Sequence, residues 1–288
     1  MKVIERIGIC STDFPVMPVD ALFARIRGHG MTAVQLSFAS LTESKYMPTG
    51  CIEIPERVAD ETLRAVSDAA QRHDMTLTAL NGTYNMAHPD ADVRKAGLSC
   101  LKTVIEAAVA LSCPMVTLCS GTRNRNHLWR PHADNAQPSA WEDMLASMRA
   151  AASIAERIGI TLAVETEAAN IIDTPEKARA LIDAVASPRL KMIMDCANLF
   201  HAGEAKRENA RAVIAHAFTL FGGDVVLAHG KDIRESESIV FCSAGEGIVD
   251  YPFFLEQLAA YGYHGDMIMH GIDDEGKIAR ALALVTKG

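Results

Sequence analysis

Two short apolar runs, ITLAVE (160–165) and RLKMIMD (189–195), decide the fold of this 288-residue chain. Each run ends on a carboxylate, Glu165 in the first and Asp195 in the second, and an amphipathic helical stretch lies between them. A strand, a helix and a second strand of this kind form a βαβ unit with parallel strands. Both acids should therefore lie at the carboxyl ends of neighbouring strands, where barrels and open α/β sheets carry their chemistry.

The same alternation of strand and helix runs through the whole chain. Strands are expected at 4–10, 32–38, 76–81, 114–120, 160–165, 190–195, 224–229 and 266–270. Helices are expected at 18–30, 56–73, 90–112, 139–158, 175–186, 207–221, 251–262 and 275–287. Eight such pairs without a change in composition predict one (β/α)8 TIM barrel domain over residues 1–288. The competing layout, a doubly wound open sheet, usually needs a glycine-rich first turn, which IGICSTDFP (7–15) does not supply.

Composition excludes several classes of function. The net charge is −8 and no basic block occurs, which argues against binding to nucleic acid through its phosphates. No window approaches eighteen apolar residues, so no membrane span is expected. The seven cysteines are scattered without a C-x-x-C pair, and no apolar signal core opens the chain. We therefore expect a cytoplasmic protein whose cysteines act as small hydrophobic residues.

Three connections, 39–55, 121–138 and 233–250, are longer than usual, and all leave from carboxyl ends of expected strands. They should overhang one mouth and cover a pocket. The second connection carries Arg123, which suits a phosphate or carboxylate, and Trp129, which suits a sugar face or a lid. We select both as candidate substrate-binding residues, with a solvated loop as the alternative.

The last four expected strands end in Glu165, Asp195, His229 and His270, spaced by one strand–helix period each. In a closed barrel these side chains converge on the axis. Two carboxylates and two imidazoles suit one divalent ion such as Mn²⁺, Co²⁺, Zn²⁺ or Fe²⁺. The alternative is that four unrelated polar residues cap helices or bind backbone.

Four segments resemble the xylose isomerase-like TIM barrels of the sugar phosphate isomerase/epimerase family. They are the strand ending at Glu165, MDCANL (194–199), AHGKD (228–232) and AGEGIVDY (244–251). The resemblance implies metal ligands at Glu165, Asp195 and His229. The family usually completes its site with a glutamate on the eighth strand, which exchanges the substrate proton together with the glutamate of strand 5. This chain has His270 there, in MIMHGID (267–273), and we expect His270 to be the fourth protein ligand.

Three further residues are candidates near the same mouth. Asn198 resembles a family position that is histidine in several epimerases, and it could bind substrate or cap a helix. Lys231 shares the facing of His229 if the strand continues that far, and it could stabilise an enediolate oxygen or form a surface ion pair. Asn81, at the end of the third strand, is a further candidate for substrate binding.

The leading hypothesis is an isomerase or epimerase that acts on a small sugar, sugar phosphate or related polyhydroxy carbonyl compound through an enediolate. It would use one divalent ion (Mn, Co, Zn or Mg), with Glu165 as base and His270 or Lys231 as partner acid. The nearest alternative is a metal-dependent dehydratase of a keto-cyclitol or similar compound. A phosphodiesterase would need histidines where the chain has Gln35, Asn81 and Cys119. A non-catalytic carbohydrate-binding barrel is the alternative of another class, and a homodimer is the default assembly.

Overall fold

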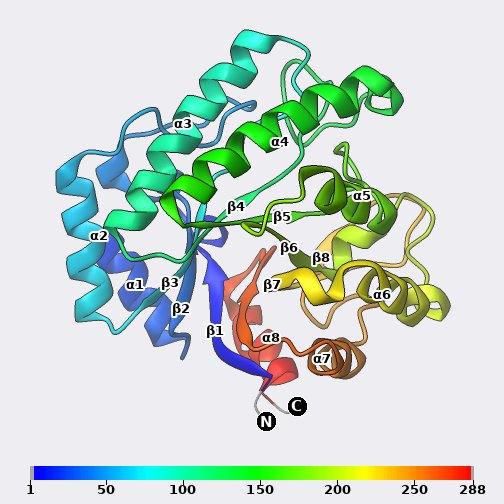
Figure 1. Cartoon of the computed structure of the whole chain (residues 1–288). Helices are drawn as coiled ribbons and strands as arrows, with labels where there is room; N and C mark the ends of the chain where they lie inside the picture. The colour runs from blue at the N-terminus through cyan, green and yellow to red at the C-terminus, as the bar shows by residue number, and fades with distance from the viewer. Residues whose placement is uncertain (1–2, 287–288) are drawn as a thin grey trace.

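The structure, a computed structural model, describes residues 3–286, in which eight parallel strands form a closed barrel (Figure 1). The strands are β1 (Ile4–Cys10), β2 (Ala33–Leu36), β3 (Thr76–Asn81), β4 (Met115–Leu118), β5 (Thr161–Glu165), β6 (Leu190–Asp195), β7 (Val225–Ile233) and β9 (Gly265–Met269). Neighbours along the chain pair with one another, and the ring closes because β9 pairs with both β7 and β1. The expected (β/α)8 barrel is confirmed.

One helix follows each barrel strand and packs outside the ring (Figure 1). The helices are α1 (Val19–Gly28), α2 (Asp60–Arg72), α3 (Ala91–Ala110), α4 (Pro138–Ile158), α5 (Pro175–Val185), α6 (Arg207–Phe221), α7 (Tyr251–Ala260) and α8 (Ile278–Val285). Their starts follow local chemistry: the Thr174 side chain accepts a hydrogen bond from the Lys177 amide, and Pro175 takes the first helical position. Asp250 caps α7 in the same way.

The largest departure from the expected elements lies after β7. This strand runs on to Ile233 and pairs with an antiparallel strand, β8 (Phe241–Ser243), that the sequence did not predict. The turn that follows β8 is held by the buried carboxylate of Asp232, which accepts hydrogen bonds from the amides of Gly245, Gly247 and Val249. Much of the connection 233–250 is therefore anchored structure, not a free loop.

Two apolar layers build the core. The main one lies between the strands and the helices, and a smaller one fills the barrel. The inner cluster consists of Cys10, Ala33, Ala79, Ala163, Ile193, Leu227 and Ile268, with Met115 packed against it. Because side chains alternate along a strand, the residue two positions further on each strand faces the same axis, nearer the carboxyl end. This inner layer is the floor of the candidate site.

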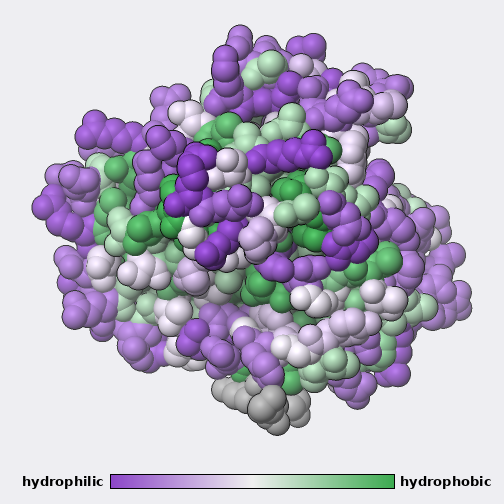
Figure 2. Space-filling view, viewed as in Figure 1, coloured by the Kyte–Doolittle hydropathy of each residue, from purple (hydrophilic) through white to green (hydrophobic). Residues whose placement is uncertain are grey.

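The outside of the molecule matches its composition. Hydrophilic side chains dominate the outer helices in the face seen in Figure 2. All seven cysteines are free and buried, which agrees with their expected use as small hydrophobic residues. No helix within residues 3–286 is long and apolar enough to cross a membrane.

Candidate metal centre and active site

A polar layer lies directly above the apolar floor of the barrel. Counting two residues on from each member of the inner cluster gives Thr12, Gln35, Asn81, Thr117, Glu165, Asp195, His229 and His270, one from each barrel strand or its end. All except Asp195 border one cavity of about 90 Å³. Cys10, Ser37, Glu53, Thr83 and Trp129 complete its wall. The alternation of side chains along the strands therefore places the predicted site residues Asn81, Glu165, Asp195, His229 and His270 in a single layer.

Three of the four predicted ligands form one compact group. The Nδ1 atom of His229 lies 3.5 Å from Glu165 Oε2 and 3.6 Å from Asp195 Oδ2. One ligand atom from each residue lies within 4.8 Å of the others. Asp195 and His229 are only 1% exposed, so their neighbours are fixed by packing. Spacing of this kind allows one cation to reach all three side chains.

Two donor atoms of this group are free for an ion. Asp195 Oδ1 accepts a hydrogen bond from the Ala197 amide at 3.0 Å, but Asp195 Oδ2 and His229 Nδ1 are buried without hydrogen-bond partners. His229 Nε2 lies 2.9 Å from Gln35 Oε1, an oxygen that can only accept, so Nε2 carries a proton. In the neutral ring, Nδ1 then presents its lone pair to the two carboxylates. These residues fit a divalent metal ion.

Electrostatics favour a positive charge among the three side chains. Burial alone would lower the pKa of His229, but the carboxylates of Asp195 and Glu165 beside its ring outweigh burial and raise the pKa to about 9. Burial raises the pKa of Asp195, yet Lys231 and His229 outweigh burial and hold it below its ordinary value. The two acids thus stabilise a cation between them, either a proton on the imidazole or a metal ion.

His270 lies beside this group without joining it. It follows β9 and borders the cavity, as expected, and its ring centroid is 5.5 Å from that of His229. Its Nδ1 lies 3.6 Å from Asp13 Oδ1, too far for a hydrogen bond, and within the described residues that nitrogen has no hydrogen-bond partner. The compact group contains Glu165, Asp195 and His229 but not His270, whose ligand role stays a prediction.

Asn198 and Lys231 are buried behind Glu165 and do not border the cavity. Lys231 Nζ donates to Asn198 Oδ1 at 2.8 Å, and Asn198 Nδ2 donates to Glu165 Oε2 at 3.3 Å. The ammonium group also lies 3.5 Å from the ring centroid of Phe241 on β8. In this arrangement both residues act on Glu165, whereas the sequence suggested that Asn198 contacts substrate and Lys231 takes part in proton transfer.

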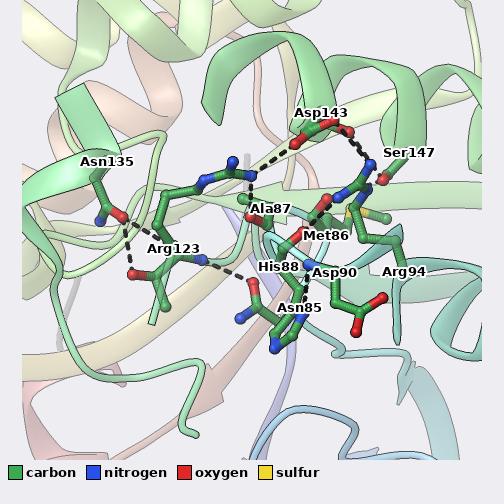
Figure 3. Close-up of polar contacts among 11 residues, drawn as sticks. Asn85, Met86, Ala87, His88, Asp90, Arg94, Arg123, Asn135, Asp143 and Ser147 are labelled. Atoms are coloured by element: carbon green, nitrogen blue, oxygen red, sulfur yellow. Dashed lines mark hydrogen bonds and ion pairs between the residues drawn. The ribbon is translucent and has the colours of Figure 1, made fainter. Parts of the chain in front are cut away.

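Arg123 is not placed where the expected contact with substrate requires it. Figure 3 shows its side chain directed toward Asp143 on α4. Its Nη1 lies 2.7 Å from Asp143 Oδ2 and donates to the Ala87 carbonyl at 3.0 Å, while Arg94 binds the other oxygen of Asp143. Arg123 therefore fastens its loop to α4. Trp129 and Asn81, by contrast, do border the cavity.

Sequence reasoning missed Glu53 and the role of Gln35. Glu53 borders the cavity from the connection between β2 and α2, and its Oε1 accepts a hydrogen bond from Trp129 Nε1 at 2.7 Å. A long loop has no hydrophobic period that would show which side chains face the cavity, so no signal in the sequence pointed to Glu53. For Gln35 a signal existed, because it is a polar residue at the inward phase of an otherwise apolar strand, AVQL.

A larger hollow, of about 360 Å³, lies at the opposite end of the barrel. Val3, Ile7, Thr32 and Leu255 contribute to its wall. None of the predicted site residues borders it, and it lies at the amino-terminal ends of the strands, where barrels do not carry their chemistry. The smaller polar cavity is the candidate site.

Comparison with known proteins decides the family. The sequence profile described as xylose isomerase-like TIM barrel matches residues 23–287. The chain belongs to the xylose isomerase-like TIM barrel family. No curated protein matches it significantly in sequence.

Solved structures support the fold of this family member. A magnesium complex of a xylose isomerase-like TIM barrel protein from Mycobacterium smegmatis matches with a TM-score of 0.72 at 14% identity, covering 98% of this chain and 97% of that one. D-psicose 3-epimerase from Clostridium cellulolyticum H10, solved with D-tagatose, gives 0.71 at 15% identity, with 98% and 97% covered. The 3-keto-D-glucoside 4-epimerase of E. coli gives 0.69 at 16% identity, with 98% and 99% covered.

Proposed function

We propose that the chain is a divalent-metal-dependent isomerase or epimerase of a small polyhydroxy carbonyl compound. The observation that carries this proposal is the group of Glu165, Asp195 and His229, with two unpartnered buried donor atoms, at the edge of a cavity walled by hydroxyls and amides. Two solved structures with the same fold are of a D-psicose 3-epimerase and a 3-keto-D-glucoside 4-epimerase, enzymes named for reactions of this class.

Glu165, Asp195 and His229 would hold the ion. When bound, a divalent ion would polarise the carbonyl and the adjacent hydroxyl of the substrate, which acidifies the C–H bond between them. Two carboxylates and one imidazole accept Mn²⁺, Co²⁺, Zn²⁺ or Mg²⁺. A structure with this fold was solved in complex with magnesium.

Glu165 is the proton-transfer residue in this proposal. Its Oε2 accepts a hydrogen bond from Asn198 Nδ2 and faces His229, while Oε1 accepts no hydrogen bond from the described residues. Glu165 also borders the cavity, so Oε1 is available to a substrate C–H. Lys231 and Asn198 are positioning residues, because they keep Oε2 fixed while Oε1 reacts.

His270 is the proposed partner acid. It borders the cavity, it is next to His229, and its Nδ1 is not used by another residue of the described chain. Glu165 takes the proton from carbon, and the protonated His270 imidazole gives its own proton to oxygen or to the neighbouring carbon; Glu165 then releases its proton to solvent and His270 takes one up. Because imidazole replaces the carboxylate expected on the eighth strand, this route is a one-carboxylate variant of the reaction.

The test is exchange of substrate hydrogen with solvent. Metal-loaded protein is incubated in D₂O with a panel of ketoses, ketose phosphates and keto-cyclitols, and deuterium incorporation and products are followed by NMR and mass spectrometry. Glu165→Gln should reduce exchange by roughly 10²- to 10⁴-fold, the usual contribution of a general base. Glu142→Gln, an exposed acid on α4, is the matched control and should exchange like the parent protein.

Two outcomes would contradict the assignment. Unchanged exchange in Glu165→Gln would place the base on another residue. A product that has lost water in place of an isomer would make the protein a dehydratase, which uses the same proton abstraction and then expels a hydroxyl.

A further inference from the structure

The wall of the cavity is rich in neutral hydrogen-bonding groups. Six of its side chains are hydroxyls or amides, namely Thr12, Gln35, Ser37, Asn81, Thr83 and Thr117. Its two acids are Glu53 and Glu165, and no arginine or lysine of residues 3–286 borders it. Hydroxyls and amides exchange hydrogen bonds with sugar hydroxyls, whereas phosphates and carboxylates are usually held by arginine or lysine.

Two cationic side chains expected near this mouth, Arg123 and Lys231, are committed to other partners. Arg123 is bound to Asp143 and to the Ala87 carbonyl on the α4 side of its loop. Lys231 is buried under Asn198 and Phe241, behind the cavity wall. A phosphate group inside the cavity would therefore meet no cationic side chain except the histidines.

Glu53 is held in a defined position on the wall. Its amide donates to the Thr83 carbonyl at 3.1 Å, and the neighbouring Ile52 forms an antiparallel bridge with Tyr84. Its Oε1 accepts from Trp129 Nε1 at 2.7 Å, while its Oε2 accepts no hydrogen bond within the described chain. Burial raises the pKa of Glu53, and the Trp129 hydrogen bond opposes that rise by favouring the ionised form.

The order of the strands places Glu53 across the mouth from Glu165, Asp195 and His229, the proposed metal ligands, which we call the metal group. Glu53 follows β2 and is tied to the segment after β3, whereas Glu165, Asp195 and His229 come from β5, β6 and β7. In a ring of eight strands β2 lies opposite β6. A ligand held at the metal group of this narrow cavity therefore presents its far side to Glu53.

We propose that the cavity takes an uncharged polyhydroxy carbonyl compound, and that Glu53 selects it. The Oε2 atom accepts a hydrogen bond from a substrate hydroxyl, and the carboxylate repels phosphate or carboxylate groups on competing compounds. The proposal rests on the proposed function, because it takes this cavity as the substrate site. It narrows the substrate class from sugars and sugar phosphates to unphosphorylated sugars and cyclitols.

The test compares affinities for neutral and phosphorylated ligands by titration calorimetry. Metal-loaded protein is titrated with D-fructose, D-tagatose and D-psicose, and with the 6-phosphate of each. At least one free ketose should bind about tenfold or more tightly than its phosphate ester. Glu53→Gln keeps the shape of the side chain but removes its charge, so the ratio of the two affinities should fall by roughly tenfold. Glu56→Gln, an exposed acid on the same connection, should keep the ratio.

A second variant tests the role of Glu53 independently, in case Glu53→Gln does not fold. Trp129→Phe keeps an aromatic ring but removes the N–H group that fixes Glu53. It should lower the ratio of the two affinities by less than Glu53→Gln does. The ratio of the affinity for a ketose to the affinity for its phosphate ester is the informative quantity, because general damage to the protein would weaken the binding of both ligands alike.

The outcomes separate the two proposals. A phosphate ester that binds as tightly as its ketose in the parent protein overturns the inference, and turnover of that ester keeps the proposed function. If Glu53→Gln has the same ratio of affinities for ketose and phosphate ester as the parent protein, Glu53 does not select the substrate. If neither ketoses nor esters bind, the proposed function fails and the inference fails with it.

Discussion

The orientation of the His229 ring depends on a residue from the other side of the barrel. His229 comes from β7, and its Nε2 is bound by the amide oxygen of Gln35 on β2 at 2.9 Å. This contact turns Nδ1 toward Glu165 and Asp195. Metal-binding histidines commonly have such a partner on the second ring nitrogen, because it fixes both the tautomer and the ring angle. At the proposed metal site, Gln35 would therefore orient the ligand His229 without being a ligand itself.

Gln35→Leu should lower metal affinity by roughly 10- to 100-fold, the usual effect of removing the partner of a ligating histidine. The reason is that the ring loses its acceptor and no longer holds Nδ1 toward the carboxylates. Affinity for Mn²⁺ and Zn²⁺ is measured by equilibrium dialysis. Thr83→Val is the control, since Thr83 borders the same cavity without contacting the ligands, and its affinity should match the parent protein. Equal losses in both variants would show a general effect of the cavity wall.

At the scale of elements, the sequence predicted the strands and helices that show a hydrophobic period. It did not predict the elements and side-chain partners that depend on tertiary contacts. The runs that end in Glu165 and Asp195 form strands because they are apolar and bounded by helix signals, and their inward phase follows from alternation. The strand β8 has three residues, FCS, too few to show a period, and it exists because β7 offers it an edge. Arg123 was selected by residue type alone, and its true partner, Asp143, comes from another element.

The two long connections that wall the cavity are fastened to each other. The Leu128 amide donates to the Gly50 carbonyl at 2.8 Å, and Cys51 Sγ lies 3.3 Å from the Arg125 carbonyl. Gly50 has φ of +85°, and a Cβ there would lie 2.8 Å from the Asn126 carbonyl oxygen. A side chain at this position would therefore need both a strained backbone and a wider gap between the loops.

Gly50→Ala should destabilise the protein by about 1–3 kcal/mol, the usual cost of a residue forced into an unfavourable backbone region. It should also make residues 121–138 more sensitive to proteolysis, because the contact with Asn126 must open. Urea denaturation and limited proteolysis measure the two effects. Gly28→Ala is the control: no atom lies within 4 Å of the added Cβ, and this helix position should tolerate or gain from alanine. Equal stability of the two variants would contradict the strain argument.

For the whole molecule, the three proposed metal ligands lie on adjacent strands. Asp195 on β6 pairs directly with His229 on β7. Glu165, at the end of β5, pairs with Ile193 on β6. An ion held by all three binds only the folded barrel, since the unfolded chain separates its ligands. At the proposed site, metal binding would therefore be linked to folding, and added metal should raise the stability of the entire barrel.

A divalent ion at 100 times its dissociation constant adds about 2.7 kcal/mol to folding, which corresponds to a rise in Tm of roughly 4–5 °C for a chain of this size. Scanning calorimetry of chelator-treated protein with and without Mn²⁺ or Zn²⁺ measures this rise. Asp195→Asn removes a ligand charge but keeps the oxygen that caps Ala197, so the variant should fold and lose the rise. Asp134→Asn, an exposed acid in the connection before α4, should keep it. If Asp195→Asn shows the same rise as the parent protein, the ion binds elsewhere in the chain. The assignment of Asp195 as a ligand would then be wrong.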